Sequence, residues 1–281
     1  MKRLVNRRPR GWTILRYAAL TALCLVWIYP FLWLVSASLK TPIEIFSKGL
    51  NLLPNTPVWS NYIRAWGQAG FSTYMLNTII VTVGTVALVV LHTALSGYVL
   101  GRYQFVGRKF VIGVLGATLV VPAGLTIVPI VDLTNALGLL NGHGGIILAL
   151  GGSGQSAAIL LYAGYFRGLP RELEEAATMD GAGFLRIFFS VMMPLAGPVT
   201  ATVTVLTFLA AWNAFLVPLV FTFGTPELRT LPVGMLAFVG TNETDWSGMA
   251  AAATISLLPV IVFFFFAQRY FVEGIAGAVK A

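Results

Sequence analysis

Long stretches without any charged residue constrain this chain more than any other feature of its sequence. They cover residues 17–39, 65–101, 110–131, 133–166, 187–226 and 246–268. A helix needs roughly 20 apolar residues to cross the hydrocarbon core of a bilayer, and each stretch is long enough for one crossing. Charged residues make up only 10% of the 281 residues, whereas about a quarter of a soluble domain is charged. The pattern predicts a single transmembrane domain over residues 1–281.

Polar and glycine-rich segments inside the longer stretches predict the connecting loops. Two such loops are expected, at Asn135 to Gly145 and at Gly224 to Gly248. The remaining apolar segments predict six helices, near 17–39, 75–100, 110–132, 146–166, 199–222 and 250–269. The predicted fold class is therefore an all-α polytopic membrane protein with six transmembrane helices.

The distribution of lysine and arginine predicts the orientation of these helices. Of the 18 basic residues, fourteen fall in the N-terminal tail, in the loops after the second and fourth predicted helices, and in the C-terminal tail. Cytoplasmic loops of membrane proteins carry such an excess. Both termini are predicted to be cytoplasmic, and residues 40–74, with a short surface helix from about Ser60, are predicted to lie outside. Because the excess accompanies apolar segments, the net charge of +8 indicates membrane topology, and no nucleic-acid partner is expected.

The sequence gives little support to an enzymatic function. It contains no GxxxxGK[ST] phosphate-binding loop, so ATP hydrolysis is not expected in this chain. Ser153 lies in a GxSG pattern, which suggests an intramembrane serine protease, but that chemistry requires a base such as histidine within reach. We interpret Gly151, Gly152, Ser153 and Gly154 as positions of close helix approach. We expect no catalytic residue, no metal site and no cofactor.

A second alternative is a stand-alone secondary transporter. Such a protein should show inverted repeats or a chain of ionisable residues within the membrane. His92 lies in the middle of the second predicted helix and Asp132 near the outer end of the third. We expect His92 to have a pairing or packing role and Asp132 to be solvated at the interface.

The predicted cytoplasmic loop at residues 168–198 has an unusual pattern. Pro170 suits the first turn of a helix, and Gly181 can end that helix in a left-handed conformation. Pro194 and Pro198 disfavour one straight helix leading into the fifth crossing. Three acidic residues follow Pro170: Glu172, Glu174 and Glu175. Negative side chains are favoured near the N-terminus of a helix, which carries a partial positive charge. Because a cytoplasmic loop normally favours bases, this acidic helix with small residues beside its acids predicts a docking surface.

This loop resembles the EAA-x3-G-x9-I-x-L-P motif of permease subunits of prokaryotic ATP-binding-cassette (ABC) importers. The matching positions are Glu175, Ala176, Ala177, Gly181, Val191, Met193 and Pro194. Val191 and Met193 replace the isoleucine and leucine of the pattern, and both remain apolar. Further segments resemble the carbohydrate branch of the family, and the C-terminal ones its maltose-type second permease: Ser38–Thr41, Asn61-Tyr62, Ala211–Asn213, Thr230–Gly234, Asp245-Trp246, Gln268–Gly274 and Gly277–Lys280.

The resemblance implies a type I ABC importer permease fold in the prokaryotic plasma (inner) membrane. It implies half of the pathway of an ATP-driven sugar importer, with a second permease subunit, two ATPase subunits that carry ATP and Mg, and an extracytoplasmic sugar-binding protein. The implied ATPase-coupling residues are Glu174, Glu175, Ala176, Ala177, Asp180, Gly181 and Pro194. The outer loop 224–248 is expected to contact the binding protein and the tail near Gly274 to Ala281 the ATPase. Trp212 and Asn213 are candidates for the sugar path, through stacking and hydrogen bonding.

Overall fold

The computed structural model describes residues 10–47, 51–68, 70–240 and 243–278. Within those ranges the regular structure is helical, apart from one antiparallel bridge between Val239 and Thr244. The chain divides into two compact units, one formed by residues 1–70 and 237–257 and the other by 71–236 and 258–281. Five basic residues of the predicted cytoplasmic tails lie outside the described residues: Lys2, Arg3, Arg7, Arg8 and Lys280.

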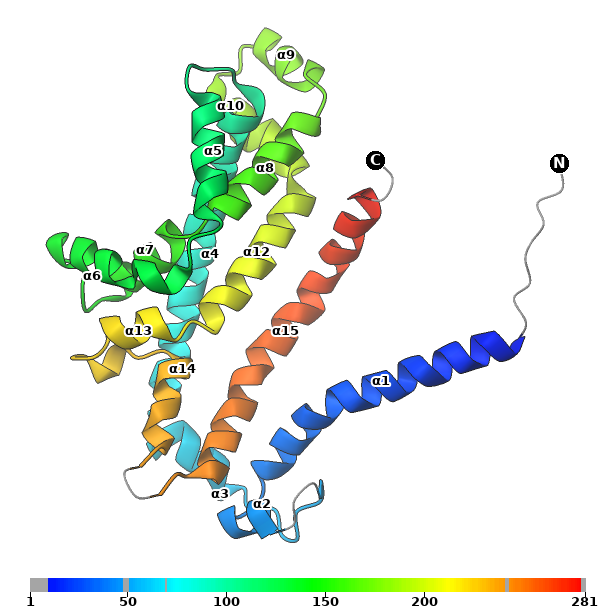
Figure 1. Cartoon of the computed structure of the whole chain (residues 1–281), viewed down its shortest axis with the longest axis vertical. Helices are drawn as coiled ribbons and strands as arrows, with labels where there is room; N and C mark the ends of the chain where they lie inside the picture. The colour runs from blue at the N-terminus through cyan, green and yellow to red at the C-terminus, as the bar shows by residue number, and fades with distance from the viewer. Residues whose placement is uncertain (1–9, 48–50, 69, 241–242, 279–281) are drawn as a thin grey trace. The chain divides into compact units, whose positions relative to one another are not determined.

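The larger unit is organised around α4 (Phe71–Arg102), a helix of 32 residues. Figure 1 shows α4 running beside α8 (Ser156–Gly168) and α12 (Gly197–Trp212), and α7 (His143–Gly152) also packs on it. A cluster of buried aromatic rings fills the space at the C-terminal end of α4. The ring centroids of Tyr98 lie 5.5 Å from Phe166 and 5.4 Å from Phe188, which is a favourable spacing for aromatic pairs.

The short elements of this unit connect the long helices. They are α5 (Arg108–Thr118), η2 (Ala123–Thr126), α6 (Ile127–Ala136), α9 (Glu172–Met179), α10 (Phe184–Ile187), η3 (Phe188–Met192), α11 (Met193–Leu195), α13 (Leu216–Phe221), η4 (Pro226–Leu228) and α14 (Leu231–Gly234). The 3-10 helix η5 (Met235–Phe238) crosses from this unit into the smaller one.

Two glycines one turn apart bring α4 and α8 into close contact. A Cβ atom at Gly97 would lie 2.9 Å from the backbone nitrogen of Ala163, and one at Gly101 would lie 2.7 Å from its carbonyl oxygen. Small residues at this spacing allow helix backbones to approach in a membrane. The sequence analysis missed this pair.

The glycines that we expected at close approaches have different roles. A Cβ at Gly151 would lie 2.8 Å from Leu88, so this position is a close approach, but open space surrounds Gly152 and Gly154. Gly154 instead has a φ of +70°, a left-handed conformation that glycine adopts without steric cost. The assignment of Gly152 and Gly154 to helix packing is therefore wrong, because this segment interrupts the helix.

The interruption between α7 and α8 bends the predicted fourth span by 57°. A break at membrane depth requires other donors for the freed carbonyl groups. Three carbonyls at the end of α7 accept side-chain hydrogen bonds. Ser153 Oγ donates to the carbonyl of Ala149 (2.7 Å), and Gln155 Nε2 donates to the carbonyl of Leu150 (3.0 Å). The carbonyl of Gly151 accepts a hydrogen bond from His92 Nε2 (2.9 Å). The pairing role predicted for His92 is confirmed, and Asp132 is exposed as expected.

The helices differ from six straight crossings. Among the residues that the structure describes, three helices are long and apolar enough to cross a membrane, within α1 (Arg10–Ala37), α4 and α15 (Trp246–Ala278), and two bent pairs bring the possible number to five. The second pair bends by 81° between Phe184–Leu195 and α12, next to the prolines predicted to interrupt it. The expected third helix over 110–132 ends at Thr118, before Pro122, and α12 ends ten residues short of the predicted 222.

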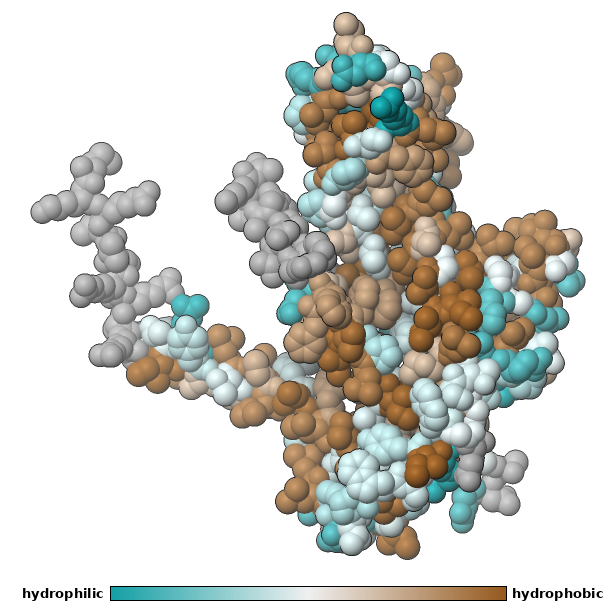
Figure 2. Space-filling view, turned by 180° about the vertical axis from the view of Figure 1, so that it is seen from behind, coloured by the Kyte–Doolittle hydropathy of each residue, from teal (hydrophilic) through white to brown (hydrophobic). Residues whose placement is uncertain are grey.

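The smaller unit contains α1, α2 (Pro42–Ser47), α3 (Ser60–Ile63), the π-helix η1 (Arg64–Gln68) and the start of α15. Its buried core joins Ala37, Ile45 and Ala250. The side chains of α1 are exposed along most of its length, with Val26 at 72% and Trp27 at 71%. Brown, apolar side chains cover much of the face seen in Figure 2. Such a surface is suited to lipid, since large apolar patches are rare on soluble proteins.

The close approach of α4 and α8 predicts that alanine has different effects on Tm at two glycines. Gly97→Ala should lower the Tm of the detergent-solubilised protein, because overpacking against the α8 backbone costs about 1–3 kcal/mol. Gly164→Ala, in α8 with open space around it, should leave Tm unchanged or raise it, since alanine favours a helix by about 1 kcal/mol. Equal Tm values for both variants would contradict the packing described.

Candidate functional site

The predicted docking helix exists as α9, which lies near α10 at one end of the larger unit (Figure 1). It begins at Glu172, two residues after Pro170, and its first turn carries the three glutamates. Gly181 follows with a φ of +78°. The N–H of Gly181 donates to the carbonyl of Thr178 (2.9 Å), and that of Ala182 to the carbonyl of Ala177 (3.0 Å). These two bonds form a Schellman motif, so the predicted glycine termination is confirmed.

Adjacent glutamates on α9 have opposite environments. The carboxylate of Glu174 accepts a hydrogen bond from Tyr98 Oη at Oε1 (2.6 Å) and from Arg102 Nε at Oε2 (2.6 Å). Its side chain is 19% exposed, and that of Arg102 only 5%. Glu175 is exposed. Glu174 therefore faces α4, whereas Glu175 faces away from the unit to which α9 belongs.

Arg102 also binds the segment that joins α8 to α9. Its Nη1 donates to the carbonyls of Leu169 (2.7 Å) and Phe166 (3.3 Å), and its Nη2 to the carbonyl of Pro170 (3.1 Å). A guanidinium carries five donors in a rigid plane, and a cation is favoured at the negative end of a helix. Sequence reasoning had used Arg102 only as a topology charge, because its partners lie more than 60 residues further along the chain.

The remaining motif residues form the outer surface of α9 and its neighbours. Glu175, Ala176, Asp180, Gly181 and Pro194 are exposed, whereas Ala177 is half-buried against the aromatic cluster. Two large apolar side chains that the sequence analysis did not single out are exposed nearby, Met179 at 88% and Leu185 at 59%. An acidic residue beside small and apolar ones is therefore available for contact with another protein.

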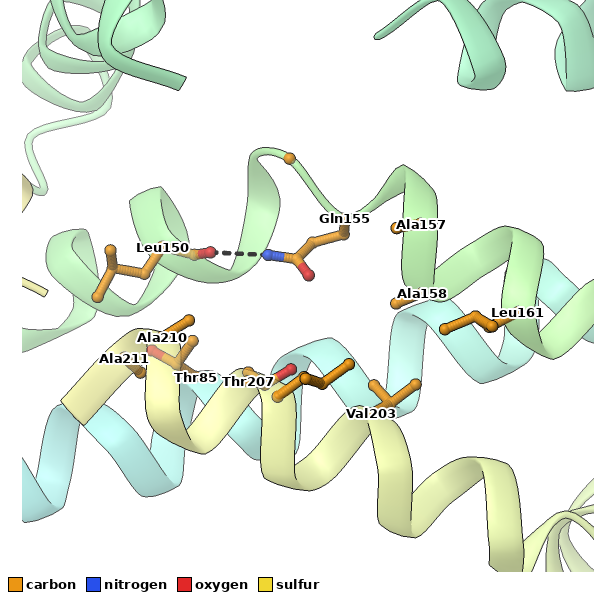
Figure 3. Close-up of a pocket in the computed structure, with 12 residues that line it drawn as sticks. Thr85, Leu150, Gln155, Ala157, Ala158, Leu161, Val203, Thr207, Ala210 and Ala211 are labelled. Carbon is orange, nitrogen blue, oxygen red and sulfur yellow. Dashed lines mark hydrogen bonds between the residues drawn. The ribbon is translucent and has the colours of Figure 1, made fainter. Parts of the chain in front are cut away.

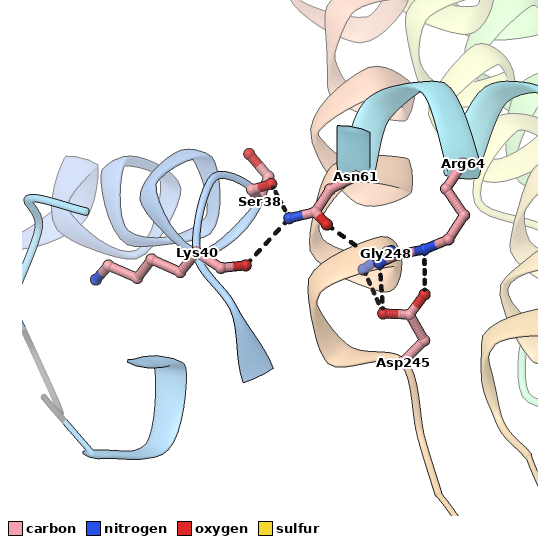
Figure 4. A network of polar contacts seen from close by, with 6 residues as sticks. All are labelled: Ser38, Lys40, Asn61, Arg64, Asp245 and Gly248. Carbon is pink, nitrogen blue, oxygen red and sulfur yellow. Dashed lines mark hydrogen bonds and ion pairs between the residues drawn. The ribbon is translucent and has the colours of Figure 1, made fainter. Parts of the chain in front are cut away.

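A second polar cluster gathers residues from distant parts of the smaller unit (Figure 4). Arg64 forms a bidentate ion pair with Asp245, from Nε to Oδ2 (2.9 Å) and from Nη2 to Oδ1 (3.0 Å). Arg64 Nη2 also donates to Asn61 Oδ1, and Asn61 Nδ2 donates to the carbonyls of Ser38 (2.9 Å) and Lys40 (3.0 Å). Three segments noted for their family resemblance thus meet here.

The Thr230–Gly234 segment is attached to α4 within the larger unit. Asn77 Nδ2 donates to the carbonyls of Glu227 (2.7 Å) and Arg229 (2.9 Å). The N–H of Leu231 donates to Thr78 Oγ1 at 2.7 Å. The first half of the predicted outer loop is therefore fixed to the N-terminal part of α4.

The two candidates for the sugar path lie at the end of α12 in different environments. Trp212 is buried and its ring stacks on Phe208, with centroids 5.5 Å apart. Asn213 is exposed, and its Nδ2 donates to the carbonyl of Leu209 at 2.8 Å. Both remain predictions.

A cavity of about 260 Å³ lies between α4, α8 and α12, beside the break that follows α7 (Figure 3). Alanine and leucine dominate its lining, and Thr85, Gln155 and Thr207 supply polar groups. The lining is mostly aliphatic and contains no aromatic ring of the kind that stacks on a sugar. We therefore assign no carbohydrate site to it.

Known proteins are similar to this chain over most of its length. Residues 93–277 match the family described as binding-protein-dependent transport system inner membrane component. The diacetylchitobiose uptake system permease protein NgcG of Streptomyces coelicolor is 36% identical, over 94% of this chain and 88% of its own length. The melibiose/raffinose/stachyose import permease protein MelC of Bacillus subtilis is 32% identical, over 97% of this chain and 98% of its own.

A solved structure has the same fold. One chain of a bacterial ABC transporter involved in the import of the acidic polysaccharide alginate superimposes with a TM-score of 0.81. It is 26% identical, and the match covers 96% of this chain and 100% of that one. With a family match over well over half of its length, this chain belongs to the inner membrane components of binding-protein-dependent transport systems, and it is a transport subunit of ABC importer type rather than an enzyme.

Proposed function

We propose that this chain is the permease subunit of an ATP-driven carbohydrate importer and forms half of the translocation pathway with a second permease. Relatives that match over nearly their whole length are named for the uptake of diacetylchitobiose and of melibiose, raffinose and stachyose. These names differ in the sugar but share the class of substrate. The finer topology, six crossings with both termini cytoplasmic, is part of this proposal, and the charge distribution supports it.

The proposed partners follow from the family. A binding protein delivers the sugar from outside, and two ATPase subunits, which carry ATP and Mg, drive the cycle from the cytoplasm. The observation that carries the coupling proposal is the exposure of Glu175 on a short helix that is firmly attached to its own unit through Glu174. An exposed acid with small and apolar neighbours suits a cleft that presents a basic residue.

Coupling then requires only that the ATPase bind α9 differently in its open and closed states. Closure of the ATPase subunits would move α9, and α9 would move the helices attached to it as a rigid body. A difference in affinity between the two states supplies the free energy for this shift.

ATP dependence tests the function itself. Membrane vesicles containing the assembled transporter should take up radiolabelled raffinose or diacetylchitobiose when ATP is present on the ATPase side, and an ion gradient alone should give no uptake. The same vesicles without the ATPase subunits serve as the control. Uptake that depends on the gradient and not on ATP would support a secondary transporter instead.

The docking role of Glu175 predicts a charge-specific effect. Glu175→Lys should weaken binding of the ATPase by about thirtyfold or more, since replacing attraction with repulsion at a close charge pair costs about 2 kcal/mol or more. The measurement is the amount of ATPase that co-purifies with the permease. Glu172→Lys introduces the same charge on the same exposed helix and should have a much smaller effect. Equal losses in both variants would contradict a specific contact at Glu175.

For the sugar path, we propose that Asn213 presents its amide to the substrate while the stacked Trp212 supports it from the protein interior. Asn213→Ala should lower the rate of sugar uptake at low concentration by about fivefold, because one hydrogen bond contributes about 1 kcal/mol. Thr202→Ala is the matched control, since the Thr202 hydroxyl also bonds a carbonyl one turn earlier on α12. Unchanged uptake by the Asn213 variant would remove it from the path.

A further inference from the structure

The contacts of Arg102 connect three elements, α4, α8 and α9. Arg102 is the last residue of α4. Its guanidinium binds carbonyls at the end of α8, the carbonyl of Pro170 in the linker and the carboxylate of Glu174 on α9. With 5% of its side chain exposed, the arginine is largely removed from water, and these partners supply the hydrogen bonds that water would otherwise make.

The carboxylate of Glu174 is held at two points on the same face of α4. Tyr98 and Arg102 are four residues apart and therefore lie one turn apart on that helix. Tyr98 holds Oε1 and Arg102 holds Oε2. Binding both oxygens fixes the position of α9 along α4 and also the rotation of the carboxylate, which a single hydrogen bond would leave free.

The same arginine restrains the linker before α9. Because the carbonyls of Leu169 and Pro170 are bound to the guanidinium that also holds Glu174, the linker and the first turn of α9 are joined to one group. A displacement of α9 therefore either carries the end of α4 with it or separates a buried charge from its partner, which is strongly unfavourable.

We propose that Glu174, Arg102 and Tyr98 form the joint through which movement of α9 reaches α4. This inference rests on the proposed coupling function. It separates the two glutamates of the motif, so that Glu175 binds the ATPase whereas Glu174 is a positioning residue that transmits the movement. The earlier assignment of Glu174 as one of a single set of coupling residues is refined accordingly, since its carboxylate is occupied within its own chain.

The test uses the assembled transporter with its ATPase subunits and requires no knowledge of the sugar. A reporter thiol is introduced by Ala210→Cys at an exposed position of α12, after Cys24→Ser removes the chain's single cysteine. The rate of maleimide labelling is compared before and after addition of ATP with vanadate. In the otherwise unchanged background, trapping the ATPase should alter the labelling rate.

Glu174→Gln keeps the shape of the side chain but removes its charge. We expect this variant to remain folded and to retain normal ATPase co-purification, with a lower Tm because Arg102 loses its charged partner, while the response to ATP and vanadate falls by at least about fivefold. Tyr98→Phe should give an intermediate response, because it removes one of the two holding points. Glu172→Gln, on the exposed side of the same helix, should respond as the background does.

Each other outcome has a distinct meaning. A full response in Glu174→Gln would overturn the joint while leaving the proposed function intact. Loss of the ATPase together with the response would show that Glu174 is a docking or folding residue, which also overturns it. A background transporter that binds its ATPase but shows no response would overturn the proposed coupling itself, and the joint with it.

Discussion

Carbonyl groups freed where helices end or break need donors from within the protein wherever lipid or packed side chains keep water away. In this chain side chains of α4 meet much of that need. His92 binds the carbonyl of Gly151 at the end of α7. Asn77 binds the carbonyls of Glu227 and Arg229. Arg102 binds the carbonyls of Phe166, Leu169 and Pro170. The bend after α7, the loop before α14 and the start of α9 all depend on these bonds.

The central position of α4 has a steric basis as well. Gly97 and Gly101 let α8 approach so closely that an added Cβ would collide with its backbone. The same stretch of α4 carries Tyr98 and Arg102, so close packing and the polar contacts to Glu174 occur within about one helical turn. A short acidic helix, which has too few residues to be stable alone, is thereby held firmly against a long one.

This attachment explains how one motif can serve two purposes. Neighbouring residues on a helix point about 100° apart, so Glu174 faces α4 while Glu175 faces outward. The inner acid connects α9 to its own chain, and the outer acid is available to a partner. A docking helix that lacked the inner contact would yield to the partner's movement without passing it on.

The sequence by itself determined the membrane class, the positions of α1, α4 and α15 and the existence of α9 with its glycine termination, because these follow from local composition and spacing. Through the family motif it also predicted Glu175, Ala176 and Gly181 as coupling residues, and this assignment stays a prediction. Only the tertiary structure decided the breaks at Ser153–Gln155 and after Thr118, the close-approach glycines of α4 and the role of Arg102. Apolar composition is the same in a straight helix and a bent one, and the partners of Arg102 are remote in sequence, so no local pattern distinguishes these features.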